Sequence, residues 1–466
     1  MPTILGANSV SGDYQVSNSI RLEADDSPKL SKTVSTATNN TNLTVSLWYK
    51  LGESANMGFI SKFADSNNRF HLRIMDDGSL LAFNNVSGTY HYKTTTAKLR
   101  DFSAWYHIVF AYDTTDSTAA DRLKIYLNGT RLTSFVNNTN PSSNEALKIA
   151  SDTSNPLKLF CSNNEDSYLS GYVSDLYYID GQTKAPTDFG KTNENGVWIP
   201  KRYGGTFGNN GFKMEFKQTG SSANASGIGA DTSGNDHHLT VANLAGTDIT
   251  TDTPTNNFCT FNRIAFGGGG LTDYTGRLTN GNLVGDTTAN SDDYTYLSTF
   301  PTNMPFYFEM KFEDVHGSGN DQRVGIVRVE KSSQGGSHAE AHYRRDGNIH
   351  SLNAAGNAVA TALTSKEVIT DNDIIGVAAD NTTNNNVKFY HNGSLQGTID
   401  IVSTELYMPF VRLYGDSSTT KVSANFGNPN FSISSGNSDA NGYGNFEYAV
   451  PSGYYALCTK NLAEYG

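Results

Sequence analysis

The sequence predicts an all-β protein that forms two β-sandwiches in tandem. Short runs of alternating apolar and polar residues, bounded by Asn, Gly, Asp and Ser, recur along the 466 residues, whereas apolar residues at helical spacing are nearly absent. A hairpin pattern occurs twice, as LKIYLNGT at 123–130 and as VKFYHNGS at 387–394. Hydrophobic residues make up 37% of the chain and include 25 Tyr and 24 Phe, which is enough apolar surface for two cores.

The first half contains a series of strand candidates, in the order 19–22 (SIRL), 44–50 (TVSLWYK), 105–112 (WYHIVFAY), 123–127 (LKIYL) and 171–181 (GYVSDLYYIDG). Asn128 and Gly129 follow the fourth candidate, and both residue types tolerate the positive φ of a type I′ turn. We therefore expect a hairpin with its tip at Asn128. An equivalent hairpin is expected in the second half, because IIGVAAD at 374–380 precedes the second copy of the pattern as IVFAYD at 108–113 precedes the first.

The middle of the chain is rich in Gly, Ser and Asn and contains only short strand candidates. Phe212, Met214 and Phe216 alternate with charged residues and predict a half-buried strand, which belongs to the first sandwich or lies across the junction. The four glycines at 267–270 are the expected hinge, with the boundary between the sandwiches near 265–280. The chain is thus divided into an N-terminal arm, a first sandwich, a connector and a second sandwich, at 1–18, 19–200, 201–280 and 281–466.

Charge and composition exclude several classes of protein. The chain has 34 Lys and Arg against 46 Asp and Glu, a net charge of −12, and no basic cluster that would replace the counterions of a nucleic acid. No stretch approaches the roughly 18 apolar residues of a membrane-spanning helix, and residues 1–6 lack the basic region of a secretory signal. Cys161, Cys259 and Cys458 form neither a disulfide framework nor a metal-binding pattern, so we expect buried thiols in a protein made in a reducing cytoplasm.

The strand candidates resemble known families. Their order and spacing in the first half resemble the laminin-G-like jelly rolls of the concanavalin A-like superfamily, over residues 15–200. The second half resembles a SPRY domain over residues 295–460, through FYFEM at 306–310, RVGI at 323–326, DIIGVAAD at 373–380, VKFYHNG at 387–393 and YMPFVRLY at 407–414. The join between them, which begins VWIPKRYGGTFGNNGFKMEF at 197, is similar to a connector in structural and fibre proteins of marine bacteriophages.

The resemblance to concanavalin A-like folds also raises the question of glycan cleavage. The related enzymes carry their carboxylates on one strand face as E-x-D-x-x-E. Glu309 and Glu313 share a strand face here, but the middle acid is missing, so hydrolysis is not expected and no catalytic residue is assigned. The family uses tryptophans such as Trp48 and Trp105 to fill the core, and Trp198 is expected to plug the connector. Exposed Tyr, Asn and Asp residues in loops are then the expected glycan contacts, and the sequence does not single any of them out.

Metal and cofactor sites are not expected either. Calcium needs several oxygen ligands at the rim of a sandwich, and the acidic loops available for it are 76–78, 231–236 and Asp292–Asp293. None has the spacing of a calcium-binding loop, so calcium is kept as an alternative only. The histidines that might hold another metal are His237, His238, His338, His342 and His350. They lack a nearby Cys or acidic ligand at metal spacing.

The resemblance to phage proteins implies a non-enzymatic protein of a bacteriophage virion surface, as a capsid knob or fibre or as part of a tail fibre. Its lectin-like sandwiches would contact host-surface glycans, and its other partners would be virion proteins and further copies of the chain. The chain would be assembled into the particle in the host cytoplasm. A purely structural role, in which both sandwiches bind only other viral subunits, is the main alternative. A polysaccharide-cleaving enzyme is the third.

Overall fold

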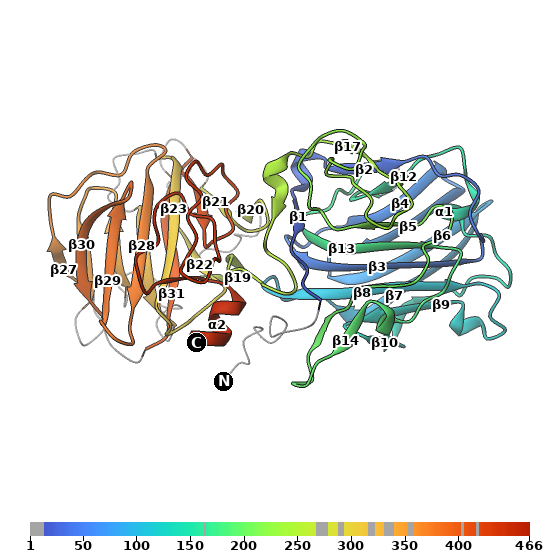
Figure 1. The fold of residues 1–466 in the computed structure, drawn as a ribbon, viewed down its shortest axis with the longest axis horizontal. Coiled ribbons are helices and arrows are strands. Elements are labelled where there is room, and N and C mark those ends of the chain that lie inside the picture. Colours follow the sequence, from blue (N-terminus) through green and yellow to red (C-terminus); the bar gives the residue numbers. More distant parts are fainter. Residues whose placement is uncertain are drawn as a thin grey trace. The chain divides into compact units, whose positions relative to one another are not determined.

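The computed structural model describes residues 14–162, 165–266, 278–287, 293–315, 322–329, 340–352, 358–401, 405–415 and 419–466. Within these residues the chain forms two compact units, which divide between Thr255 and Asn256 and are here named the first and the second unit (Figure 1). Strands dominate both units, which confirms the predicted all-β class. Among the helices of these ranges, none is long and apolar enough to span a membrane.

The first unit contains two large antiparallel sheets. Sheet A has the strand order β10 (Thr130–Leu132), β9 (Leu123–Leu127), β8 (Trp105–Asp113), β3 (Asn42–Leu51), β13 (Gly171–Asp180), β1 (Ser19–Leu22) and β18 (Ile249–Thr250), and β16 (Phe212–Met214) also pairs with β13. Sheet B has the order β11 (Phe135–Asn138), β7 (Thr89–Lys98), β6 (Ser79–Val86), β5 (Asn68–Ile74), β4 (Met57–Asp65), β12 (Leu157–Leu159), β2 (Lys29–Lys32) and β17 (Thr240–Ala242). A separate hairpin pairs β14 (Gly190–Thr192) with β15 (Trp198–Pro200).

Sheets A and B pack face to face around one core. In β3 the apolar residues at alternate positions, among them Leu43, Val45 and Leu47, enter the core, while the positions between them point outward. Sheet B contributes Phe70, Leu72 and other residues of its strands to the same cluster. The period-2 pattern of the sequence is therefore the direct cause of the sandwich.

The second unit is built in the same way. Sheet C has the order β20 (Leu278–Thr279), β21 (Val284–Asp286), β32 (Lys421–Asn425), β23 (Phe306–Asp314), β28 (Ile374–Asp380), β29 (Asn386–His391) and β30 (Ser394–Asp400), and β33 (Tyr455–Ala456) also pairs with β23. Sheet D has the order β19 (Phe261–Phe266), β22 (Asp293–Ser298), β31 (Tyr407–Tyr414), β24 (Arg323–Arg328), β25 (Glu340–Arg344), β26 (Ile349–Leu352) and β27 (Ala358–Leu363). Phe306, Phe308 and Met310 of β23 meet Val411 of sheet D in the shared core. The short helix α2 (Thr459–Tyr465) ends the chain.

The two predicted hairpins are confirmed and have the same geometry. Asn128 and Asn392 both have φ of 47°, and the glycines that follow have φ of 79° and 80°. The Asn128 N–H donates to the His107 carbonyl and its Oδ1 accepts the His107 N–H, both at 2.8 Å. Asn392 makes the same two bonds with Ile374, both at 2.9 Å. In sheets A and C the hairpin strands also occupy equivalent edges, β9–β10 and β29–β30.

The connector differs from the sequence-based prediction. Residues 201–280 were expected to separate the sandwiches, but the structure divides the units between Thr255 and Asn256. Strands β16, β17 and β18 add to β13, β2 and β1 of the first unit. Short strands of two or three residues satisfy their backbone groups most readily by joining an existing sheet, and this makes the segment part of the first sandwich. Of the two options for the strand at 212–216, the structure thus selects the first sandwich.

The outer ends of the predicted domains also differ. Residues 14–18 of the expected N-terminal arm contact the first unit, while residues 1–13 lie outside the described part of the chain. The second unit begins before the predicted residue 281, because β19 pairs with β22 of sheet D. The expected hinge at 267–270 lies outside the described residues.

The aromatic ring above Gly129 gives a first prediction. A Cβ added at Gly129 would lie 2.6 Å from the Trp198 ring, whereas one added at Gly196, with nearly the same φ, would meet nothing within 4 Å. Gly196→Ala therefore adds only backbone strain of about 1–2 kcal/mol. Gly129→Ala adds this strain and an overlap that costs about 1–3 kcal/mol more in the free energy of unfolding, measured in urea. Equal losses in the two variants would show that the Trp198 ring does not press on this turn.

Candidate functional site

The outer face of sheet A is covered by later parts of its own chain. The Trp198 indole N–H donates to His107 Nδ1 at 3.0 Å, and its ring stacks on the imidazole with centroids 5.9 Å apart. Asp252 accepts from Lys50 Nζ at 2.8 Å and from the Trp105 indole N–H at 3.0 Å. Both Lys50 and Asp252 are fully buried. This face is therefore occupied by residues of the protein.

The three tryptophans lie together at this covered face. Trp48, Trp105 and Tyr172 form a buried cluster, and Trp198 packs on it from the covering segment. The first two are buried in a hydrophobic cluster, as expected of core residues, but this cluster lies on the outer face of sheet A and is separate from the main core. Trp198 does act as the plug that the sequence predicts, because it closes the cover over the cluster.

A buried histidine beneath this cover has a fixed protonation pattern. His107 Nε2 lies 2.8 Å from Ser46 Oγ, and its Nδ1 receives the indole N–H of Trp198. Because an indole N–H only donates, Nδ1 must be unprotonated, and Nε2 carries the proton that it donates to Ser46. Burial lowers the pKa of His107 to about 3. The imidazole therefore has no free lone pair with which to take a proton from the serine hydroxyl.

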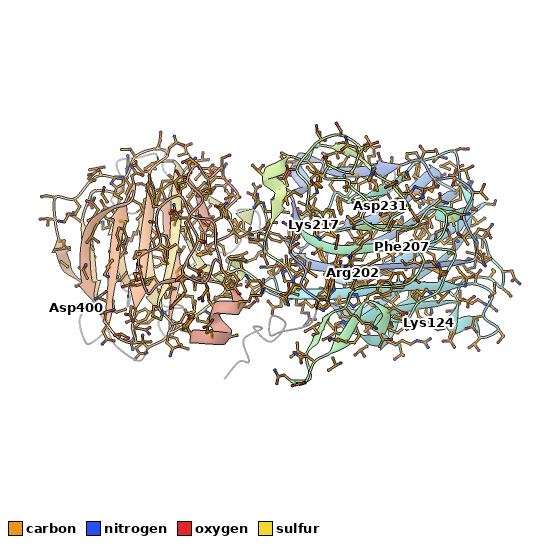
Figure 2. The ribbon with its side chains drawn as sticks, in the orientation of Figure 1. Lys124, Arg202, Phe207, Lys217, Asp231 and Asp400 are labelled. Atoms are coloured by element: carbon orange, nitrogen blue, oxygen red, sulfur yellow. The ribbon has the colours of Figure 1, made fainter. Side chains whose placement is uncertain are left out.

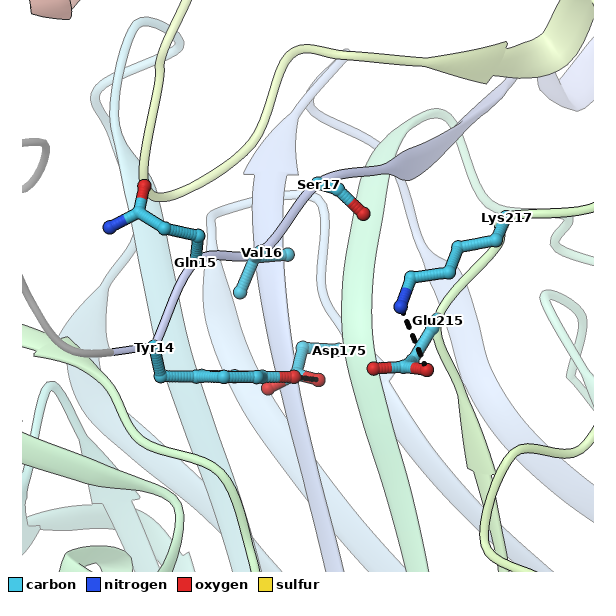
Figure 3. A pocket seen from close by; sticks show the side chains of 7 residues that line it. All are labelled: Tyr14, Gln15, Val16, Ser17, Asp175, Glu215 and Lys217. Carbon is cyan, nitrogen blue, oxygen red and sulfur yellow. Dashed lines mark hydrogen bonds and ion pairs between the residues drawn. The ribbon is translucent and has the colours of Figure 1, made fainter.

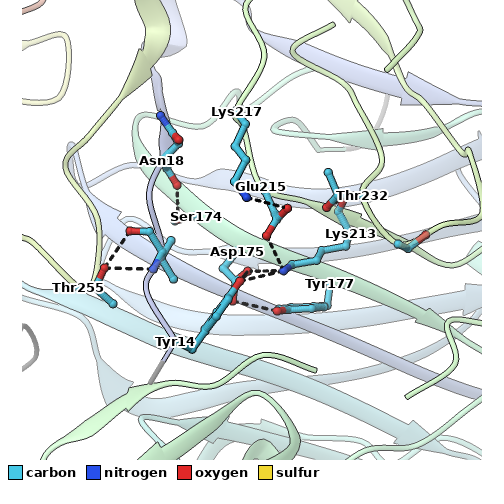
Figure 4. Close-up of polar contacts among 12 residues, drawn as sticks. Tyr14, Asn18, Ser174, Asp175, Tyr177, Lys213, Glu215, Lys217, Thr232 and Thr255 are labelled. Carbon is cyan, nitrogen blue, oxygen red and sulfur yellow. Dashed lines mark hydrogen bonds and ion pairs between the residues drawn. The ribbon is translucent and has the colours of Figure 1, made fainter. Parts of the chain in front are cut away.

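A polar hollow lies where the first described residues cross the edge of the covered face. Figure 3 shows its lining residues: Tyr14, Gln15, Val16, Ser17, Asp175, Glu215 and Lys217. At its floor, Lys213 Nζ lies 2.8 Å from the Tyr14 hydroxyl, 2.8 Å from Glu215 Oε1 and 3.3 Å from Asp175 Oδ1 (Figure 4). Tyr14 and Tyr177 each donate to Asp175, at 2.8 and 3.0 Å. The polar groups at the floor of the hollow thus bond to one another within the chain.

The electrostatics of this cluster follow from burial and from Lys213. Burial raises the pKa of Asp175, although Lys213 opposes the shift. Burial acts on Glu215 too, but the ammonium groups of Lys213 and Lys217 outweigh it and lower the pKa of Glu215 to about 2. Asp175 lies in a bulge of β13 with φ of 46°. The cluster ties residues 14–17 to sheet A, which is a structural role.

The outer face of sheet B has a different character, because rings and basic side chains gather on it. Arg69, His71 and Arg73 occupy alternate positions of β5, and register places His71 opposite Phe83 of β6 and Phe83 opposite Tyr92 of β7. In the neighbouring row, Asn85 of β6 lies between Arg69 of β5 and Tyr90 of β7. We call this set the aromatic–basic face: Arg69, His71, Arg73, Phe83, Tyr90 and Tyr92.

The side chains of the aromatic–basic face contact one another. The Phe83 ring stacks on His71 with centroids 4.4 Å apart, and the Arg69 guanidinium lies 5.2 Å from the Phe83 centroid. The rings of Tyr90 and Tyr92 follow at 5.8 and 6.2 Å. Phe83 does not belong to the core between the sheets, whereas its neighbour Ala82 does. The side chain of Tyr90 is 46% exposed. Tyr90 is the exposed ring of the set and Tyr92 is half-buried, and such rings beside charged donors on a strand surface suit contact with a hydroxyl-rich ligand.

A comparison with protein families finds one match within the first unit. Residues 23–187 match the concanavalin A-like lectin/glucanases superfamily. The matched range holds β2 to β13 and includes the whole aromatic–basic face of the first unit. No curated protein matches the chain.

Several solved structures match the chain or a part of it. Domains LG4–5 of the mouse laminin α1 chain share 11% identity, with 97% of this chain and 89% of that chain covered and a TM-score of 0.31. A human SPRY domain shares 19% identity over 30% of this chain and 96% of its own, with a TM-score of 0.22. The CBM40 domain of the Ruminococcus gnavus IT-sialidase shares 12% identity over 37% and 96%, with a TM-score of 0.27.

The two glutamates of β23 have separate roles. Glu309 is fully buried and accepts the backbone N–H groups of Glu447 and Tyr448, at 3.0 and 2.8 Å. Burial raises the pKa of Glu309 against these bonds. Glu313 pairs with Lys421 at 2.8 Å. Glu309 therefore holds the segment at 447–448 over sheet C, much as Asp252 holds the cover of sheet A.

The acidic loops considered for calcium are engaged by protein donors. Asp231, labelled in Figure 2, accepts the N–H groups of Lys213, Ser233 and His237 and the Ser233 hydroxyl, at 2.8 to 2.9 Å. Asp77 accepts the Ser79 N–H at 2.9 Å and pairs with Lys98 at 2.7 Å. Asp292 and the side chain of Asp293 lie outside the described residues. Within the described ranges, no group of three or more His, Cys, Asp or Glu side chains is placed to hold a metal ion.

The structure brings together two of the five candidate histidines as neighbours. His342 and His350 face each other across β25 and β26, with ring centroids 4.9 Å apart, while His338 lies outside the described residues. His237 Nε2 lies 2.6 Å from the Asn209 carbonyl, and His238 Nδ1 accepts the Asp231 N–H at 3.1 Å.

The cysteine thiols are buried and free of disulfides, as the sequence predicts. Burial raises the pKa of Cys161 to about 11 and that of Cys458 to about 12.

Acid titration tests the tie between residues 14–17 and sheet A. Because the pKa of Glu215 falls to about 2 in the folded state, its contribution is present above the unfolded value near 4.5 and is lost as pH falls toward 2. Glu215→Gln should therefore lower the free energy of unfolding at pH 7 by up to about 3 kcal/mol and flatten the acid limb of the stability curve. The exposed Glu194 gives the control variant Glu194→Gln. If the free energy of unfolding fell equally with acid in the unaltered chain, Glu215→Gln and Glu194→Gln, the assignment would be contradicted.

Proposed function

We propose that the chain is a non-enzymatic binding protein of a bacteriophage virion surface, and that its first unit holds host-surface glycans at the aromatic–basic face. The exposed Tyr90 and the half-buried Tyr92 on sheet B carry the proposal. It is supported by the match of the same residues to a superfamily whose description includes lectins. A glycan could bind the outer face of sheet A only if the covering segments moved away, because Trp198 and Asp252 occupy that face.

The geometry suits a weak site that is used in many copies. Tyr90 and Tyr92 offer ring faces for the C–H groups of a sugar, while Arg69 and Arg73 donate hydrogen bonds to its oxygens. Few of these groups lie in a deep cavity, so one site should bind weakly. Many copies on one particle raise such binding by about 10² or more without any new contact.

The virion part of the proposal is supported by the sequence of the connector, which is similar to that of phage structural proteins. Residues 197–255 belong to the first unit here, and β16, β17 and β18 join its two large sheets. In this sandwich the first described residues and the last residues of the unit are bonded to each other. Such a closed unit suits the surface of a virus particle, which has to resist dilution and proteases. A purely structural role is the competing proposal, and it makes the opposite prediction for glycans.

Binding to an array of bacterial polysaccharides separates these functions. Tyr90→Ala and Tyr92→Ala should each weaken binding about tenfold, since truncating a central ring typically removes about 1.4 kcal/mol or more. Leu395→Ala, at a side chain of the second unit that is 56% exposed, is the matched control and should bind as the unaltered chain does. Silence of the unaltered chain across the array would favour assembly, and release of reducing sugar would favour an enzyme.

A further inference from the structure

Lys213 packs against two tyrosine rings and lies beside two carboxyl groups of the first unit (Figure 4). Its Nζ lies 5.2 Å from the ring centroid of Tyr14 and 5.1 Å from that of Tyr177. The same atom lies 3.3 Å from Asp175 Oδ1 and 2.8 Å from Glu215 Oε1. The Lys213 side chain is 4% exposed and that of Asp175 is 1% exposed. An amine, an acid and a second carboxylate are therefore held together where little water reaches them.

The backbone of β13 is bent at the acid of this cluster. Tyr177 lies opposite Lys213 in the pairing of β13 with β16. Between Ser174 and Tyr177 the pairing of β13 with β3 shifts register, and Asp175 in this bulge has φ of 46°. A bulge of this kind re-aims a side chain, and the left-handed backbone is unfavourable for a residue with a Cβ. Strain of this kind is concentrated at functional sites, so the position of the Asp175 carboxyl group calls for a function.

The surroundings of Asp175 favour attack on its carboxyl carbon. Burial raises the pKa of Asp175, which favours the neutral acid over the carboxylate. An amine attacks the neutral form more readily, because the charge of a carboxylate opposes a nucleophile. The Tyr14 hydroxyl donates to Oδ1 at 2.8 Å and the Tyr177 hydroxyl to Oδ2 at 3.0 Å. These donors are placed to stabilise the negative charge that develops on oxygen during the attack.

Glu215 can move the protons that such an attack requires. Its Oε1 accepts a hydrogen bond from Lys213 Nζ at 2.8 Å, which suits a group that takes a proton from the ammonium. Burial raises the pKa of Glu215, but the ammonium groups of Lys213 and Lys217 outweigh it and lower the pKa to about 2. The Lys213 part of this effect ends when its proton leaves. Reacting atoms about 3–3.5 Å apart are in range for attack, and Nζ lies 3.3 Å from Oδ1 of the acid.

We propose that the folded chain joins Lys213 to Asp175 through an isopeptide bond. The Lys213 nitrogen forms a bond to Cγ of Asp175, and the bond from Cγ to one carboxyl oxygen breaks. This oxygen leaves as water with two of the three ammonium protons, which Glu215 relays, and nothing is oxidised or reduced. Glu215 keeps Lys217, at 3.2 Å, as its charged partner. The bond closes a ring of chain that contains Trp198, so it limits how far the cover of sheet A can separate from β13. The inference goes beyond glycan binding and does not rest on it.

The mass of the full chain tests this bond. After incubation of the folded protein at pH 7, the denatured chain should be lighter than its sequence mass by one water. Trypsin should not cleave after Lys213, and the digest should contain a branched peptide that joins the segment of Lys213 to that of Asp175. A chain with the full sequence mass and normal cleavage after Lys213 overturns the proposal and leaves an ordinary ion pair.

Variants assign the roles. Lys213→Arg should keep its full mass, because a guanidinium stays protonated. Asp175→Asn should still form the bond with loss of ammonia, and its product should have the same mass as the bonded unaltered chain. Lys201→Arg, at an exposed lysine that donates to the Thr187 carbonyl, is the control and should lose one water. Loss of water in Lys213→Arg would place the bond elsewhere and overturn the assignment. If a variant fails to fold, the branched peptide of the unaltered chain decides the case.

A time course after cell-free synthesis tests the part given to Glu215. Glu215→Gln cannot relay protons and should form the bond at least about a hundredfold more slowly, the usual effect of removing a general base. Equal rates in Glu215→Gln and the unaltered chain would overturn this role while leaving the bond itself in place.

Discussion

In the first unit, the buried ion pair between Lys50 and Asp252 holds the covering segment on sheet A, and the rest of the arrangement depends on this contact. A buried pair is costly unless further bonds satisfy its atoms, and the indole N–H of Trp105 supplies one of them. With Asp252 in place, the exit of the unit lies against its entry, since Ser19 Oγ donates to the Asp252 carbonyl at 2.6 Å. One face of the sandwich is thereby closed, and our proposal therefore places the ligand at sheet B.

The second unit repeats this solution with different residues. The Asn–Gly turns have the same dihedral angles, and each is topped by a ring from a later segment: Trp198 would touch a Cβ at Gly129, and Tyr448 would touch one at Gly393, both at 2.6 Å. Where sheet A uses Asp252, sheet C uses Glu309 to hold its cover. The shared strand order and the shared cover indicate that one architectural plan was used twice, although the residues that secure it differ.

Sequence reasoning was most successful where the structure depends on local chemistry. The alternation in the strands and the turn at Asn128 follow from side-chain period and from the tolerance of Asn and Gly for positive φ, so they were predictable. The fate of residues 201–255 was not, because strands of two or three residues have no pattern of their own and are defined by the sheet that they join. Tyr14 and Asp175 are 161 residues apart, and no local signal links them. The alternation of Arg69, His71 and Arg73 was visible in the sequence, but only the covering of sheet A shows why the face of sheet B matters.

The central claim is that ligands meet sheet B, since the chain itself covers sheet A. Hydroxyl-radical footprinting of the full chain, with and without a bound bacterial polysaccharide, tests it most directly. Tyr90, which is 46% exposed, and Tyr92 should lose most of their reactivity when the polymer binds, while Trp198 and Tyr126 on the sheet A side should not change. Protection at Trp198 with Tyr90 unchanged would contradict the account.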